Sequence, residues 1–83
     1  MAKRIVWTDQ AKSDVRSIDQ QTAMRILHGL ARFVTTGEGE VKQLRGFDPP
    51  EFRLRIGDYR VHFYDRDDCI EILAVKHRRE AYR

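Results

Sequence analysis

Cysteine, proline and long apolar runs are all scarce in this sequence. Of its 83 residues, one is cysteine and two are proline. The lone thiol of Cys69 excludes an intrachain disulfide, so we expect a reducing cytoplasm and a small apolar packing role for this side chain. No apolar run approaches the ~20 residues of a membrane span, and the N-terminus lacks a signal-peptide core. We therefore expect neither membrane insertion nor export.

Several motifs of enzyme and cofactor sites are also missing. The sequence holds no glycine-rich phosphate loop, no nucleophile elbow and no Cys-X-X-Cys pair. His77 and Glu80 have the spacing of a metal pair, but the cations around them in "KHRREAYR" disfavour a bound dication. We expect no metal and no other cofactor.

The composition that remains is that of a small folded domain with a basic surplus. Hydrophobic residues make up 41% of the chain and charged residues 35%, which favours one folded domain over residues 1–83. The formal net charge is +3. A surplus of this size suits an anionic partner, but the place where the charges gather decides more than their sum.

The N-terminal half predicts a strand followed by two helices. Residues 3–7, "KRIVW", have the β-branched and aromatic content of a strand. Thr8 is a typical N-cap for an amphipathic helix over 9–18, and a second apolar stripe of helical period ends at Gly37. The short break between them predicts an antiparallel helical hairpin. The segment "GEGEVKQLRGFDPPE", rich in glycine and proline, predicts a connecting loop.

The C-terminal half predicts an antiparallel meander. Two alternating runs flank Gly57-Asp58, the composition of a two-residue hairpin turn, and the apolar run "CIEILAV" follows an acidic turn at 65–68. The turn fixes the register of the buried face as Phe52 opposite Phe63, Leu54 opposite Val61 and Ile56 opposite Tyr59. The predicted fold class is α+β: an N-terminal strand, a helical hairpin and a three-stranded antiparallel meander in one sheet, with the helices on one face.

The same register predicts a cationic open face. It sets Arg55 opposite Arg60 and Arg53 opposite His62. Like charges directly opposite each other destabilise a sheet, so stability alone would not select them. Several guanidinium groups on an open sheet form a phosphate-binding surface. The alternative is a solvated face whose arginines keep an exposed sheet soluble.

The C-terminal segment "KHRREAYR" favours the phosphate-binding interpretation. It adds further cations and two titratable groups, His77 and Tyr82, which we expect at the same cationic surface. Imidazole exchanges protons near neutral pH, and nearby arginines favour the phenolate form of a tyrosine. Either group could be a general acid or base, and the spacing does not choose between them.

These motifs resemble a known family of bacterial toxins. "LRIGDYRVHFY", then an apolar strand, then "HRREAYR" near the C-terminus is similar to the RelE/ParE superfamily of type II toxin-antitoxin systems. The resemblance covers nearly the whole chain. It implies the fold described above and, for RelE-like members, cleavage of mRNA in the ribosomal A site by attack of a ribose 2′-hydroxyl on the adjacent phosphodiester, without a metal.

The resemblance also implies residue roles. Arg60 and Arg53 would bind the scissile phosphate and Arg55 the neighbouring backbone, while Tyr82 would be the base. Arg78 would stabilise charge or protonate the leaving group, with His77 as its rival for acid or base. Further phosphate contacts are expected from Lys42, Arg45 and Lys76.

Two other functions remain open at this point. A ParE-like inhibitor of DNA gyrase would bind a protein and need no acid or base, and a non-catalytic RNA-binding protein would keep the basic face without the chemistry. The expected partners are a cognate antitoxin in a hetero-oligomer, together with ribosome and mRNA, and no membrane. An acidic and apolar antitoxin segment would suit the open face.

Overall fold

The computed structural model describes residues 3–81, and the side chains of residues 3–79. Its elements are β1 (Arg4–Trp7), α1 (Asp9–Arg16), α2 (Gln20–Thr36), β2 (Glu40–Leu44), β3 (Glu51–Ile56), β4 (Tyr59–Asp65), β5 (Cys69–His77) and α3 (Arg78–Ala81). The predicted α+β class is confirmed, with its N-terminal strand, helical hairpin and antiparallel meander. Strand β2 and the short helix α3 are additions to the prediction.

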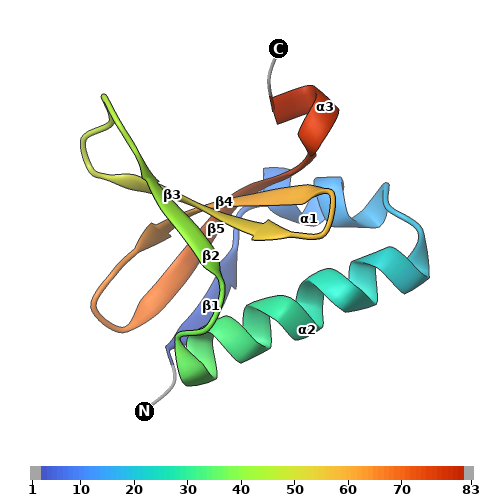
Figure 1. Ribbon diagram of the computed structural model, residues 1–83, viewed down its shortest axis with the longest axis horizontal. Coiled ribbons are helices and arrows are strands. Elements are labelled where there is room, and N and C mark those ends of the chain that lie inside the picture. The colour runs from blue at the N-terminus through green and yellow to red at the C-terminus, as the bar shows by residue number, and fades with distance from the viewer. Residues whose placement is uncertain (1–2, 82–83) are drawn as a thin grey trace.

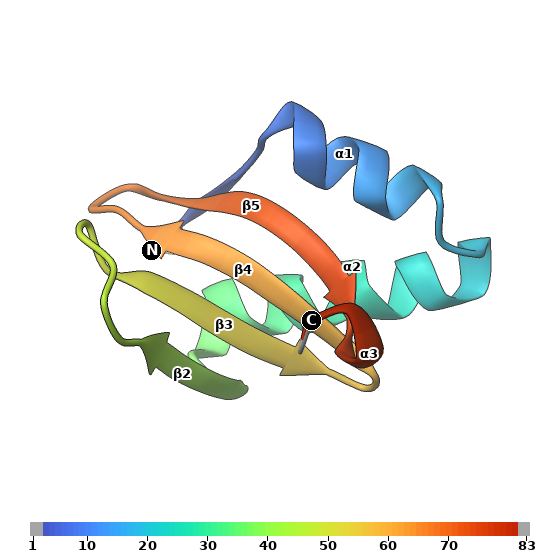
Figure 2. The ribbon, with the colours of Figure 1, turned by 90° about the horizontal axis from the view of Figure 1, so that it is seen from above.

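The strands form one sheet in the order β1-β5-β4-β3-β2 (Figure 1). The pairing is antiparallel except between β1 and β5, which run parallel, so the sheet is mixed. Helices α1 and α2 lie on one side of the sheet, with α1 beside β5 (Figure 2). Within the described residues, the opposite face of the sheet carries no helix across it. No helix in this part of the chain has both the length and the apolar character needed to cross a membrane.

Strand β2 corrects the prediction of a plain connecting loop after α2. Its five residues pair with β3, with Val41 opposite Leu54 and Lys42 opposite Arg53. Four of the five are exposed, so no run of apolar side chains marks the strand in the sequence. Backbone hydrogen bonding to the free edge of β3 forms it, and that edge exists only after the hairpin has folded.

The helix ends follow the predicted capping signals. Thr8 Oγ1 accepts a hydrogen bond from the backbone N–H of Ala11 at 3.2 Å, and Gly37 ends α2 with φ 79°. Asp19, which the sequence analysis did not name as a cap, caps α2 by accepting from the N–H of Thr22 at 3.0 Å. Hydrogen bonds from the backbone and the side chain of Thr22 lower the pKa of the Asp19 carboxyl. Helix α1 ends at Arg16, two residues short of the predicted boundary, because Ser17 takes the C-cap position.

The core lies between the helices and the predicted apolar face of the meander. All three predicted cross-strand pairs on this face are confirmed. Ile26 and Leu30 of α2 are buried together with Leu54 and Val61 of the sheet. Burying each such side chain contributes about 1.5–3 kcal/mol to stability.

Asp14 closes the exposed backbone edge of β5. The pairing of β1 with β5 ends at Trp7 opposite Ile72, so no strand of the described residues lies beside the rest of β5 on this side. Asp14 Oδ2 accepts a hydrogen bond from the N–H of Val75 at 2.9 Å, and its Oδ1 lies 3.5 Å from Lys76 Nζ. The carboxylate of α1 thus replaces a missing strand and fixes the helix against the sheet.

Candidate nucleic-acid interface

Two cross-strand rows of side chains lie on the open face of the sheet. The pairing confirms the predicted register and extends it over the neighbouring strands. One row is Glu40, Arg55, Arg60 and Lys76, and the other is Lys42, Arg53, His62 and Ala74. Paired residues share a face of a sheet, so the rows place cations from several strands side by side.

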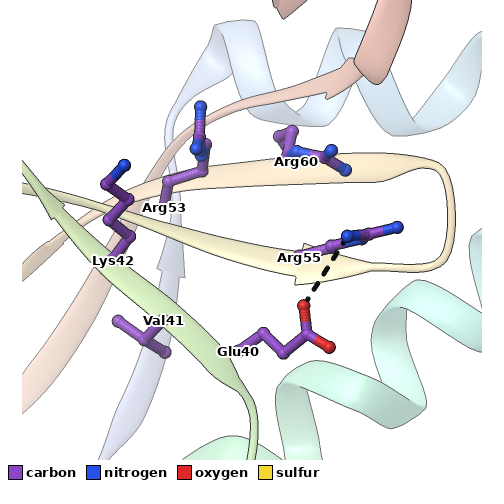
Figure 3. Close-up of a pocket in the computed structure, with 6 residues that line it drawn as sticks. All are labelled: Glu40, Val41, Lys42, Arg53, Arg55 and Arg60. Atoms are coloured by element: carbon purple, nitrogen blue, oxygen red, sulfur yellow. Dashed lines mark ion pairs between the residues drawn. The ribbon is translucent and has the colours of Figure 1, made fainter.

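A shallow pocket of about 240 Å³ lies on this face of the sheet (Figure 3). We call it the cationic pocket, and it is lined by Glu40, Val41, Lys42, Arg53, Arg55 and Arg60. Its four cations come from β2, β3 and β4. Their nitrogens offer an array of hydrogen-bond donors that matches phosphate oxygens.

Arg60 is the buried member of this pocket. It is 6% exposed, and no described carboxylate lies within ion-pair distance of it. The guanidinium of Arg60 donates a long hydrogen bond from Nη1 to the carbonyl oxygen of Tyr59, at 3.5 Å. No described side-chain nitrogen is both buried and without a hydrogen-bond partner, so the guanidinium nitrogens that make no bond are accessible. An anionic ligand is the natural complement of a guanidinium without a counter-charge.

Arg55 and Glu40 form a loose pair at the rim of the pocket. Arg55 Nη1 lies 3.9 Å from Glu40 Oε2, and both side chains are more than half exposed (Figure 3). Such a pair is weak in water, so it leaves Arg55 available to a phosphate. Arg66, by contrast with Arg55, has a close counter-charge, because it donates hydrogen bonds of 2.8 and 3.0 Å to the carboxylate of Glu71. These contacts raise the pKa of the Arg66 guanidinium.

Two other predicted phosphate ligands lie outside the pocket lining. Lys76 stands opposite Arg60, on the open face by register, but its Nζ lies 3.5 Å from Asp14 Oδ1. Arg45 is exposed in the turn after β2. Both remain predicted contacts for more distant parts of a bound chain.

His77 is not placed on the cationic face, and this part of the prediction is wrong. It pairs with Tyr59, and the two rings meet edge to face with centroids 5.2 Å apart. With Thr22 and Ile26 of α2 it lines a second pocket, on the helix side of the sheet.

A β-bulge explains this placement. The register of β5 against β4 shifts between His62 and Phe63, which leaves Leu73 as an extra residue. Strict alternation after Ile72 would turn His77 to the open face. The extra residue reverses the alternation, so Val75 and His77 both face the helices.

Arg78 and Tyr82 complete the predicted set. Arg78 begins α3, where its backbone N–H donates to the carbonyl of Asp58 at 2.7 Å and its exposed guanidinium Nε lies 3.9 Å from Asp58 Oδ1. It therefore stands at the turn between β3 and β4, at the end of the cationic face. Tyr82 lies outside the described residues.

The sequence analysis did not predict one contact between polar side chains on the open face. His62 Nδ1 lies 3.0 Å from Glu51 Oε2, and the two side chains are 19% and 17% exposed. The predicted hairpin register could have indicated this contact. It makes Glu51 a diagonal neighbour of His62, within reach of a long side chain.

Comparisons with known proteins agree with this architecture. The family model for the ParE toxin of type II toxin-antitoxin systems, parDE, matches residues 5–82. No curated protein sequence matches the chain. Among solved structures, the archaeal RelE-RelB complex from Pyrococcus horikoshii OT3 includes a chain that is 26% identical, with a TM-score of 0.76 over 94% of this chain and 97% of that one.

Two more distant structures share the fold. The YoeB dimer from Staphylococcus aureus is 20% identical, with a TM-score of 0.74 over 93% of this chain and 98% of that one. A mutant of the E. coli toxin RelE in the free state is 19% identical, with a TM-score of 0.74 over 99% of this chain and 90% of that one. The family match over nearly the full length, on a fold shared with these toxins, shows that the chain belongs to the ParE toxin family of type II toxin-antitoxin systems, within the RelE/ParE superfamily.

Proposed function

We propose that this chain is a ribosome-dependent mRNA endoribonuclease, the toxin of a type II toxin-antitoxin module. The observation that carries the proposal is the cationic pocket, with the buried Arg60 that no described carboxylate neutralises. A surface that only kept the sheet soluble would not need four cations around one pocket, with one of them packed closely into the sheet.

The proposed reaction is attack of a ribose 2′-oxygen on the adjacent phosphorus. The O2′–P bond forms and the P–O5′ bond breaks, which leaves a 2′,3′-cyclic phosphate and a 5′-hydroxyl. Negative charge grows on the phosphoryl oxygens as the phosphorane forms, so donors preorganised around them accelerate the step. Arg60 and Arg53 would hold the scissile phosphate, and Arg55 and Lys42 the neighbouring phosphates.

The resemblance assigns the base to Tyr82 and the acid to Arg78 or His77. The placement of the two acid candidates favours Arg78, because it is exposed at the end of the cationic face, whereas His77 faces α2. Arg78 would then stabilise charge on the leaving 5′-oxygen. The reaction as proposed uses no metal, and no cluster of metal-binding side chains is found within the described residues.

A cognate antitoxin and a cytoplasmic location are part of the proposal. Two of the similar structures are toxin chains in complexes named RelE-RelB and RelB-RelE. The cationic face and the exposed side chains of Met24 and Phe47 would suit a partner segment with acidic and apolar residues. Such binding would also stabilise a domain of this size.

Inhibition of DNA gyrase is the alternative function. The name of the matching family, ParE toxin, favours it. A gyrase inhibitor needs no proton transfer, so cells would show DNA damage rather than arrested translation, and replacing Tyr82 would leave toxicity intact.

Primer extension on mRNA in a purified translation system tests the proposal. Wild type, Arg60→Ala and Tyr82→Phe are compared with and without ribosomes, with Arg32→Ala on the exposed side of α2 as the matched control. We expect ribosome-dependent cuts that the first two substitutions weaken and the control does not. Growth arrest without cuts would favour gyrase inhibition, and RNA binding without cuts would favour a non-catalytic protein.

A further inference from the structure

The pair of Glu51 and His62 has the arrangement of a proton-transfer group. A carboxylate only accepts hydrogen bonds, so the contact of 3.0 Å between Glu51 Oε2 and His62 Nδ1 places a proton on Nδ1. In the neutral ring, Nε2 then carries the lone pair. No described residue forms a hydrogen bond with Nε2. A carboxylate that fixes the tautomer in this way is how proteins orient a histidine base.

The pair lies beside the cationic pocket. His62 is directly opposite Arg53, which lines the pocket, and it is two residues from Arg60 on the same strand and the same face. A phosphate held by both arginines would therefore be within reach of the imidazole. The groups that face His62 are Glu51 and Arg53 on β3, Arg60 and Tyr64 on its own strand, Ala74 on β5, and Lys42 beyond Arg53 on β2.

Within the described residues, His62 is the one histidine on the open face. His28 is exposed on α2, and His77 lies on the helix side of the sheet. Guanidinium and ammonium groups only donate hydrogen bonds, so the arginines and Lys42 are donors and not bases.

We propose that His62 is a catalytic base of the ribonuclease and that Glu51 is its positioning residue. In this step the proton of the 2′-hydroxyl moves to His62 Nε2, the O2′–P bond forms, the P–O5′ bond breaks, and water protonates the 5′-oxygen. The inference rests on the proposed function. It gives His62 the role that the resemblance gives Tyr82.

The first test is the pH profile of cleavage on ribosomes, with the full chain as wild type, His62→Gln, Tyr82→Phe and Arg60→Ala. His28→Gln is the matched control. Wild type should cleave faster as the pH rises and then level off, which is the profile of a reaction that needs an unprotonated base. We expect His62→Gln to lose this rise and to cleave at least about 100-fold more slowly. The control should match wild type.

The outcomes separate this inference from the proposed function. If Arg60→Ala is inactive while His62→Gln keeps the wild-type rate and pH profile, the base assignment fails and the ribonuclease stands. If Tyr82→Phe removes the pH-dependent rise and His62→Gln does not, the base is Tyr82. If wild type makes no cuts on ribosomes, both proposals fail.

A second measurement does not depend on activity or on how well His62→Gln folds. Nitrogen-15 NMR of the imidazoles reports which ring nitrogen carries the proton. We expect the Nδ1–H tautomer for His62 in the wild-type protein, and a gain of the Nε2–H tautomer in Glu51→Ala with the signals of His28 unchanged. An Nε2–H tautomer in wild type would overturn the role of Glu51.

Discussion

In the cationic pocket, Arg60 combines low exposure of the residue with the absence of a counter-charge among the described residues. A guanidinium without a counter-charge is available to bind a phosphate. The same group stabilises the negative charge that develops in the transition state, while the stem of its side chain packs in the sheet. The two roles can be separated by measuring stability and activity in the same variant.

Replacement of Arg60 by alanine should remove activity without unfolding the protein. Losing one transition-state donor typically lowers the rate 10²–10³-fold, or about 3–4 kcal/mol of barrier. The free energy of unfolding should change little, because no described ion pair is lost and only the packing of the side-chain stem is removed. Cleavage kinetics and urea denaturation measure the two effects. Full toxicity in a well-folded Arg60→Ala protein would contradict the proposed site.

Glu40 is the one acidic side chain that lines the cationic pocket. Its carboxylate repels phosphate and holds Arg55 loosely at 3.9 Å. We expect Glu40→Gln to bind a non-cleavable RNA oligonucleotide about two- to fivefold more tightly at low salt, a factor in keeping with an exposed ion pair worth up to about 1 kcal/mol. Glu38→Gln, exposed just before β2, is the matched control. Equal affinity of Glu40→Gln and wild type would show that Glu40 lies away from the bound RNA.

At the scale of elements, Asp14 decides how α1 meets β5. Its carboxylate satisfies a strand N–H that no neighbouring strand reaches. We expect Asp14→Ala to lower the free energy of unfolding by about 1–3 kcal/mol, since it leaves a part-buried donor without a partner. Urea denaturation measures this loss, with Asp67→Ala in an exposed turn as control. A value within error of the control would mean that water replaces the carboxylate fully.

Gly29 sets the approach of α2 to the sheet. A Cβ at this position would lie 2.8 Å from Ile56 Cδ1 and within 3.2 Å of two other atoms of that side chain. Alanine favours a helix over glycine by about 1 kcal/mol, but overpacking typically costs about 1–3 kcal/mol.

We therefore expect Gly29→Ala to destabilise the protein in thermal unfolding, and to do so less when Ile56→Val makes room. A stabilised Gly29→Ala single variant would show that the helix shifts at no cost.

At the scale of the whole molecule, four cations gather in one pocket although the formal net charge is only +3. Acidic residues lie elsewhere in exposed turns, among them Asp67 and Asp68 after β4. An extended polyanion bound along the open sheet would release its counterions there. Binding should therefore depend on salt more strongly than the net charge suggests.

Four cations of the pocket that each neutralise one phosphate predict a slope of log K against log salt of about −2 to −3 for single-stranded RNA. Arg55→Ala should reduce its magnitude by about 0.7, and Arg32→Ala should leave it unchanged. Fluorescence anisotropy of a labelled oligonucleotide over a salt series measures the slope. A slope near zero would show that phosphate contacts do not drive binding.

Local chemistry made much of this fold predictable. The capping side chain of Thr8 and the turn at Gly57-Asp58 act over a few residues, so the start of α1 and the hairpin register follow from the sequence. The position of Arg55 opposite Arg60 was predictable for the same reason. Strand β2 was not predictable, because its residues are mostly exposed and it forms on an edge that other elements supply.

The sequence by itself determined the N-terminal strand, the two long helices, the meander with its hairpin register and the row of arginines on one face, since alternation and turn chemistry are local properties. Only the tertiary structure decided which groups meet there. The bulge at Leu73 turns His77 toward α2, and the folded sheet buries Arg60 and brings Glu51 to His62. A bulge and a diagonal contact depend on how neighbouring strands pack, and spacing along one chain does not encode that directly.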